Sequence, residues 1–120
     1  MSDRPRDPAC LFCRIVAGEI PSDRVAEDDK AIAFRDIAPR SPTHVLVVPR
    51  AHIPSVADLT EDDSALSGHL LAMAASIARS EGIAEGGYRL VANVGAWGGQ
   101  SVDHLHFHVM GGRPFSWPPG

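Results

Sequence analysis

Histidines alternate with large apolar residues along residues 104–110, and this alternation is the clearest pattern in the chain. Side chains two positions apart project from the same face of a strand. The pattern therefore predicts a strand with three imidazoles on one face and three apolar side chains in the core. The imidazoles belong to His104, His106 and His108, and the apolar side chains to Leu105, Phe107 and Val109. At roughly 3.3 Å per residue, the outer imidazoles would lie about 13 Å apart and could act on one phosphate-sized group.

Two other segments carry apolar residues at helical spacing. Residues 8–18 pair them at i and i+4 and contain both cysteines of the chain, which predicts a short helix. Residues 60–80 repeat them at i, i+4, i+7 and i+11, which predicts one long helix. Thr60 and Asp63 resemble a capping box at its start.

Short apolar runs bounded by turn residues predict three more strands, over residues 30–34, 44–48 and 88–94. The order along the chain is one helix, two strands, one helix and two strands. Strands linked as hairpins, with a helix crossing between the two halves, indicate an α+β fold with a mainly antiparallel sheet.

Length and charge narrow the class of protein. The 120 residues suit a single domain over residues 1–120, in which we expect residues 1–8 to be flexible and residues 113–120 to form an extended, proline-rich tail. The net charge of -4 argues against broad contact with nucleic acid or an anionic membrane. No apolar run approaches the ~20 residues of a membrane span, and the first residues lack the apolar stretch of a signal peptide. A cytoplasmic protein is the expectation.

Cys10 and Cys13 stand at a spacing that suits a metal better than a structural disulfide in a reducing compartment. A tetrahedral zinc needs two further ligands, and His52 and His104 are the candidates. Such a closed set would be structural, holding the N-terminal helix to the sheet. A redox Cys-x-x-Cys is the alternative, although no thioredoxin-like βαβ pattern surrounds the pair.

A glycine-rich loop, residues 93–101, leads into the histidine strand. Glycine permits close approach of the backbone, so the amides of residues 98–101 are candidates to hold a phosphate. The Ser101 hydroxyl and the Asn93 amide would add hydrogen bonds. The lysine and spacing of a P-loop are absent, and a simple hairpin turn is the alternative.

A dispersed apolar set beside Asp36 is the third candidate site. Core packing is its default explanation, but together with the histidines and the glycine loop it indicates a pocket for a base and a ribose. Its members are Phe12, Ile15, Ile20, Ile37 and Leu46.

The chain resembles the histidine triad (HIT) superfamily, whose defining pattern is His-x-His-x-His followed by apolar residues. The resemblance runs from about residue 10 to residue 120, and with the Trp-Pro-Pro-Gly ending it is similar to the Hint branch, the histidine triad nucleotide-binding proteins. It implies a HIT-like fold with a sheet continued across a homodimer, whose tail brings Trp117 to the partner's substrate.

The resemblance also implies an activity, that of a purine nucleoside phosphoramidase cleaving the P–N bond of adenosine 5'-phosphoramidate or lysyl-AMP. His106 would be the nucleophile and form a nucleotidyl-histidine that water hydrolyses. His108 and Ser101 would contact the phosphoryl oxygens and the leaving amine, and His44 would support the cluster.

Binding residues follow from the same resemblance. Asp36 would bind the ribose hydroxyls, the apolar set would enclose the purine, and Asn93 with the loop amides would stabilise developing charge. The implied nucleotide-binding set is Phe12, Ile15, Ile20, Asp36, Ile37, Leu46, Asn93, Gly99, Gln100, Ser101, His106, His108 and Trp117. Family members with Cys-x-x-Cys bind zinc through it and two histidines, which correspond here to His52 and His104. The zinc would be structural, and the P–N chemistry would need no metal.

Three features depart from the branch pattern. Asp103 precedes the first histidine where an apolar or aromatic residue is common, and Arg35 replaces a common histidine beside the ribose contact. Ala96 and Trp97 make the phosphate loop bulkier.

Other functions stay open at this point. A zinc-dependent hydrolase would use the three histidines as ligands of a catalytic metal, but it leaves the cysteines without a role. A dinucleoside polyphosphate hydrolase, as in the Fhit-like branch, is a second alternative, against which the Trp-Pro-Pro-Gly tail argues. A nucleotide-binding module of low turnover is the third, although His106 together with Ser101 and Asn93 favours catalysis.

Overall fold

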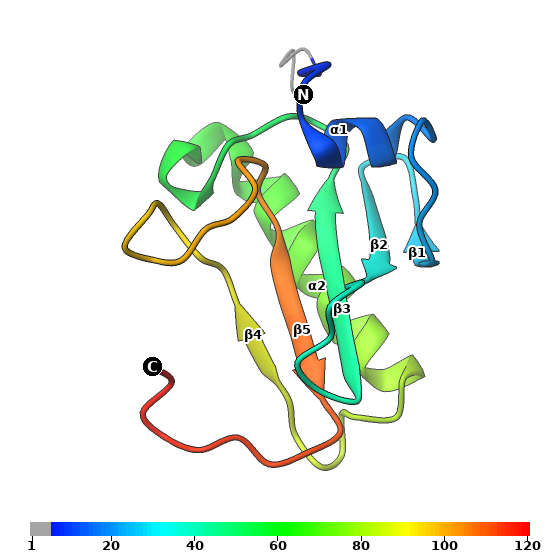
Figure 1. Cartoon of the computed structure of the whole chain (residues 1–120), viewed down its shortest axis with the longest axis vertical. Helices are drawn as coiled ribbons and strands as arrows, with labels where there is room; N and C mark the ends of the chain where they lie inside the picture. Colours follow the sequence, from blue (N-terminus) through cyan, green and yellow to red (C-terminus); the bar gives the residue numbers. More distant parts are fainter. Residues whose placement is uncertain (1–5) are drawn as a thin grey trace.

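Five antiparallel strands form the centre of the molecule in the order β1-β2-β3-β5-β4 (Figure 1). The structure is a computed structural model that describes residues 6–120, so the predicted flexibility of residues 1–5 lies outside the described residues. The strands are β1 (Arg24–Glu27), β2 (Ala31–Arg35), β3 (Thr43–Pro49), β4 (Arg89–Val91) and β5 (Phe107–Gly111). The helices are α1 (Leu11–Val16) and α2 (Ser64–Ser80). The predicted α+β class is confirmed.

The two helices cover opposite faces of the sheet, because buried side chains of the central strands alternate between two cores. One core packs against α2 and includes Ala33, Val45 and Val109. The other packs against α1 and includes Phe34 and Leu46. The candidate site lies on the second face.

Three predicted elements are close to those observed. The predicted strands 30–34 and 44–48 differ from β2 and β3 by one residue at each end. The long helix begins at Ser64, because residues Glu61–Asp63 form a 3-10 turn that is closed by the predicted capping box of Thr60 and Asp63. Gly82, at φ +76°, follows the end of α2.

Two strand predictions were wrong in extent, and one strand was missed. β4 has three residues instead of the predicted 88–94. β1 escaped prediction because two of its four residues are charged, which hides the apolar alternation. The short helix also begins later than predicted, with Cys10 as its N-cap and Cys13 inside it.

The histidine strand is shorter than the sequence predicts, because the ladder starts at Phe107. Residues 102–104 bend, and Leu105 N–H donates to Ile53 O at 2.6 Å instead of to β3. The last carbonyl oxygen of β3, Pro49 O, accepts a hydrogen bond from the imidazole of His104, whose Nε2 is 2.8 Å away. Inward and outward alternation nevertheless continues through the bend, since Leu105 and Val109 share the core against α2.

The tail after β5 contains neither helix nor strand and runs away from the sheet (red in Figure 1). Among residues 6–120, none of the helices combines the length and apolar character needed to cross a bilayer.

Candidate active site and metal centre

The three histidines of the motif divide between two clusters, which corrects the expectation that they form one row acting on a single group. The ring of His104 packs against His52, with centroids 5.0 Å apart. The ring of His106 lies 5.1 Å from that of His108, which lies 5.1 Å from His44. The division lies along the strand direction: His104, within the bend, meets Cys10, Cys13 and His52, whereas His108, on β5, meets His44.

Cys10, Cys13, His52 and His104 lie close enough to bind a metal ion, with one ligand atom from each within 4.8 Å of all the others. The Cys10 Sγ and His104 Nδ1 atoms are 3.3 Å apart, and Cys13 Sγ and His52 Nδ1 are 3.2 Å apart. The N-cap position places Cys10 one turn from Cys13, so both sulfurs point to the same side. The predicted ligand set is brought together from three separate segments.

Hydrogen bonds orient these donors for a cation. Since Pro49 O can only accept, His104 donates its Nε2–H to it, and the Nδ1 lone pair faces the sulfurs. Main-chain amides of Cys13 and Asp7 donate to Cys10 Sγ and Cys13 Sγ at 3.3 and 3.4 Å. Burial raises the pKa of the Cys13 thiol, a cost that a bound divalent cation offsets by favouring thiolate. Two thiolates with two neutral imidazoles fit tetrahedral zinc.

His106 is buried and its protonation site is set by one hydrogen bond. Its Nδ1 lies 2.7 Å from the carbonyl oxygen of His104, which can only accept, so in the neutral ring Nδ1 carries the proton and Nε2 the lone pair. The Phe12 ring meets the imidazole edge-on with centroids 5.0 Å apart. A neutral, oriented imidazole with Nε2 unprotonated is chemically equipped to act as a nucleophile.

His44 and His108 form a hydrogen-bonded pair whose protons are also assigned by the surroundings. Arg40 N–H donates to His44 Nδ1 at 3.0 Å, so His44 donates from Nε2 to His108 Nδ1 at 2.8 Å. His108 therefore carries its proton on Nε2, which lies 3.5 Å from Asn93 Nδ2; both atoms are donors in this tautomer, so this contact is not a hydrogen bond. Burial lowers the pKa of His108 to about 4 and also lowers that of His44, against the opposing charge of Asp36. Both rings are neutral at neutral pH.

Asp36, His44 and His108 also place ligand atoms within 4.8 Å of one another, which raises the question of a second metal centre. A metal on His44 Nε2 would force the proton onto Nδ1, where Arg40 N–H already donates. The donors therefore suit a chain of hydrogen bonds and do not suit a metal. The catalytic three-histidine metal site considered above is also not assembled, since His104 Nδ1 faces the cysteines.

Acidification will destabilise the protein through this pair. Between the ordinary histidine pKa of 6.5 and the folded value of about 4, the unfolded chain binds more protons than the folded one, so stability falls as pH falls. We expect His108 to account for a loss on the order of 2 kcal/mol between about pH 7 and about pH 4.5. Urea denaturation of wild type and His108→Gln at both pH values measures it. The pH dependence should be shallower in the variant, and equal dependence would contradict the assignment.

Four main-chain amides of the glycine loop were expected to hold a phosphate. Two of them instead donate hydrogen bonds within the turn of the loop itself. Gly99 N–H donates to Ala96 O at 3.1 Å and Gln100 N–H to Gly95 O at 3.0 Å. The Gln100 side chain accepts from Gly95 N–H and donates to Pro54 O and Val102 O. Gln100 thus fastens the loop, and its predicted contact with nucleotide stays a prediction. Ser101, the last residue of the loop, is exposed.

The apolar set is brought together only in part. Phe12, Ile15 and Leu46 are buried in the core under α1, and Ile20 lies at its edge. The side chain of Ile37 is 100% exposed, so core packing, the default explanation for the apolar set, is wrong for this residue. Trp117 is exposed as well.

Arg35 is not beside the proposed ribose contact. Its guanidinium donates to both carboxylate oxygens of Glu81 at 2.7 and 3.0 Å, so it points to the face covered by α2. Strand alternation explains this, because Phe34 faces α1 and the next residue must face the other side.

Sequence reasoning missed several contributors to the site. Phe34 packs on Phe12 with centroids 5.5 Å apart, and its strand position next to Leu46 was the available signal. The Arg40 amide and the Pro49 carbonyl are main-chain groups, which leave no signal in residue type.

Comparisons with known proteins agree with this geometry. The family model described as HIT domain matches residues 17–115. The chain is 49% identical to the purine nucleoside phosphoramidase of Escherichia coli K12 over 104 residues, 87% of each chain. It superposes on a HIT family hydrolase from Legionella pneumophila with a TM-score of 0.91 and 51% identity, covering 92% of this chain and 99% of that one. A histidine triad nucleotide-binding protein from Candida albicans superposes with a TM-score of 0.79 and 30% identity, covering 93% and 85%.

Proposed function

Because this chain belongs to the HIT domain family, we propose that it is a purine nucleoside phosphoramidase that hydrolyses the P–N bond of nucleoside 5'-phosphoramidates. The observation that carries the proposal is the bond from His106 Nδ1–H to His104 O, which leaves Nε2 as an oriented nucleophile. The name of the Escherichia coli relative supports the same bond as the target.

The proposed reaction proceeds in two steps. His106 Nε2 attacks the α-phosphorus, and the P–N bond breaks with its electron pair going to the amine nitrogen. The proton that this nitrogen needs enters from solvent through the His44–His108 pair, whose bonded atoms are 2.8 Å apart, so both rings are neutral again after the transfer. Water then attacks the phosphorus, and the bond from phosphorus to His106 Nε2 breaks with its electron pair going to Nε2. The proton of the water leaves through the same pair, and AMP and free His106 are released. Asn93, Ser101 and the loop amides that the turn leaves free stabilise the phosphoryl oxygens.

The nucleotide occupies the face covered by α1. The base lies against the apolar wall of Phe12, Ile15 and Leu46, with Ile20 and Ile37 at its rim, and Asp36 binds the ribose. Exposed Ile37 is consistent with this role, because a side chain that contacts a ligand has no need of protein neighbours. The walls are apolar and accept adenine and guanine alike.

A homodimer is part of the proposal. β4 is an edge strand with Leu90 exposed on it, and Leu71 is exposed on α2. Pairing of two β4 edges would cover the unpaired backbone groups and continue the sheet. The exposed Trp117 would then reach the partner's substrate.

Zinc is the metal proposed for the cluster of Cys10, Cys13, His52 and His104. A closed four-ligand site is structural, and bound zinc would supply only the attachment of α1 to the bend before β5. The P–N chemistry is proposed to need no metal.

Intact-mass analysis after rapid quenching tests the proposed chemistry. Wild-type protein mixed with adenosine 5'-phosphoramidate for milliseconds should gain the mass of one adenylyl group, and peptide mapping should place it on His106. Release of AMP without an adduct, lost on metal removal from folded protein, would favour a metallohydrolase. Binding of AMP with no release from the substrate would favour a nucleotide-binding module.

A further inference from the structure

Arg89 lies on the same face of the sheet as the active-site histidines. In the antiparallel ladder, Val91 is opposite His108 and Arg89 is opposite Met110. Partners in register share a face, and residues two apart share it too. Arg89 is therefore the diagonal neighbour of His108, at the outer strand of the sheet.

The strand order places β4, which carries Arg89, on the side of the leaving group and not on the side of the nucleoside. The apolar wall proposed for the base lies on β2, β3 and α1, and His106 and His108 lie at or next to β5. β4 is on the other side of β5, carrying Arg89 on the active-site face and leading to Asn93, whose amide lies 3.5 Å from His108 Nε2. With the nucleoside on β2 and β3, whatever is attached beyond the phosphorus extends toward β4.

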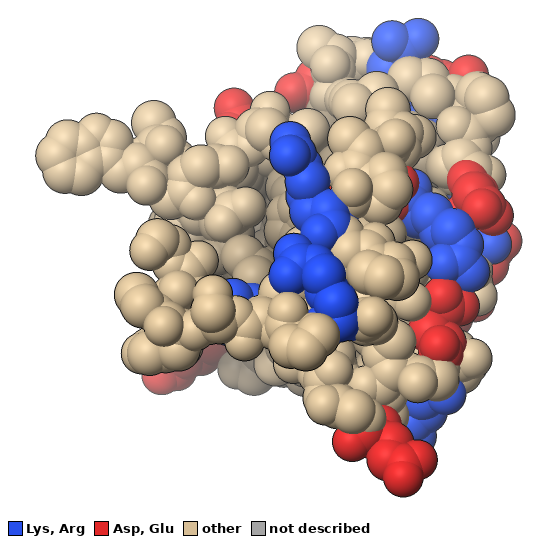
Figure 2. Space-filling view, turned by 60° about the horizontal axis from the view of Figure 1, so that its bottom comes forward, with Lys and Arg blue, Asp and Glu red and all other residues tan. Residues whose placement is uncertain are grey.

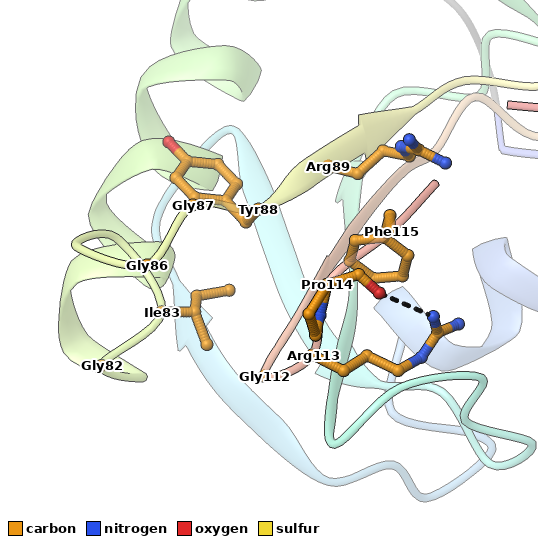
Figure 3. A pocket seen from close by; sticks show the side chains of 10 residues that line it. All are labelled: Gly82, Ile83, Gly86, Gly87, Tyr88, Arg89, Gly112, Arg113, Pro114 and Phe115. Atoms are coloured by element: carbon orange, nitrogen blue, oxygen red, sulfur yellow. Dashed lines mark hydrogen bonds between the residues drawn. The ribbon is translucent and has the colours of Figure 1, made fainter. Parts of the chain in front are cut away.

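Arg89 and Arg113 stack on the ring of Phe115. Their guanidinium carbons lie 5.1 and 4.3 Å from the ring centroid. Figure 3 shows Phe115 between them, with both guanidinium groups extending past the ring on the side away from Tyr88 and Ile83. These residues border a pocket of about 560 Å³ at the same end of the sheet.

The two positive charges are not neutralised by the described protein. Arg89 donates to Ser116 O, and Arg113 donates to Arg40 O and Pro114 O, all uncharged carbonyls. Within residues 6–120, the ion pairs involve other arginines, and neither guanidinium has a carboxylate within 4.0 Å. Figure 2 shows basic side chains side by side across a largely uncharged surface, with acidic residues toward its edges. Each guanidinium has five N–H donors, so both retain donors for a ligand.

We propose that Arg89 and Arg113 form a cationic subsite that binds a carboxylate on the leaving amine of the substrate. The inference rests on the proposed phosphoramidase function and specifies its substrate as an amino-acid phosphoramidate with a free carboxylate. A planar carboxylate matches the fork of a guanidinium in a charge-assisted, bidentate pair. An anion bound by both guanidinium groups, where they extend past the Phe115 ring, also relieves their mutual repulsion.

The test compares three substrates: adenosine 5'-phosphoramidate and its N-linked glycine and glycinamide conjugates. The last two differ only in a charged carboxylate against a neutral amide. Wild type should prefer the glycine conjugate in kcat/KM, and Arg113→Gln and Arg89→Gln should each reduce that preference at least about tenfold, as loss of a charge-assisted bond implies. Arg79→Gln, an exposed arginine in the last turn of α2, is the matched control and should leave the preference unchanged.

Hydrolysis of unsubstituted adenosine 5'-phosphoramidate distinguishes two roles of the arginines, binding of the substrate carboxylate and positioning of the C-terminal tail. It should be hydrolysed by both subsite variants within about twofold of wild type, a change well below 1 kcal/mol. An unchanged preference in both variants, or a parallel loss with all three substrates, would overturn the subsite and leave the arginines as supports of the tail. Calorimetric binding of the two conjugates to His106→Ala gives the same ratio without turnover. A failure of the proposed function, seen as no wild-type turnover, is thus distinguishable from a failure of the subsite.

Discussion

Replacement of His106 with alanine will lower turnover of adenosine 5'-phosphoramidate by at least about 10³-fold, because it removes the only atom proposed to attack phosphorus. The affinity for AMP should stay within about threefold, since the apolar wall and Asp36 are untouched. The two quantities are measured by steady-state release of AMP and by calorimetric titration with AMP. Loss of rate without loss of affinity is what removal of a nucleophile produces.

Two further variants, one conservative and one a control, test whether the loss of turnover is due to loss of the His106 nucleophile. His106→Asn retains a side-chain N–H toward His104 O, so it preserves the local bond and should be equally inactive. His69→Ala removes a histidine that contacts Asp28 from α2, on the other face, and should keep full turnover apart from any loss of stability. Turnover in His106→Ala comparable to that of wild type would contradict the proposed mechanism.

Removal of metal will destabilise the fold by at least about 3 kcal/mol while leaving the turnover of the folded fraction within about threefold. The reason is that four buried ligand atoms converge from α1, from the segment after β3 and from the bend before β5. Without a cation, two thiols and two imidazoles remain packed around an uncompensated polar centre. Urea denaturation of chelated and zinc-loaded protein measures the stability, and elemental analysis should find one zinc per chain.

Cys13→Ser supplies the matching variant, because its sulfur contacts both His52 and His104. It should be as unstable as chelated wild type and insensitive to added zinc, whereas chelated wild type should recover on zinc addition. Where Cys13→Ser fails to fold, recovery of the chelated wild type still decides the question. Turnover that disappears in folded, metal-free protein and returns with zinc would establish a catalytic metal and contradict the structural assignment.

The alternating pattern of residues 104–110 predicted which side chains face the core, and it did so correctly even where no ladder forms. Leu105 enters the core against α2 although β5 starts two residues later, because the preference of apolar side chains for the interior acts on each residue separately. The pattern did not predict where the strand begins. That limit depends on Ile53 O and Pro49 O, which come from a distant segment.

Residue type and local spacing by themselves determined the α+β class, the long helix with its capping box, the paired cysteines and the histidines available for chemistry, because these depend on neighbours a few positions apart. Only the tertiary structure decided which histidine does what. The tautomers of His104, His106 and His44 are set by main-chain groups of Pro49, His104 and Arg40, and main-chain groups are alike in every residue. The same is true of Arg35 and Arg89, which face opposite sides of the sheet because of strand register, a property of the assembled chain.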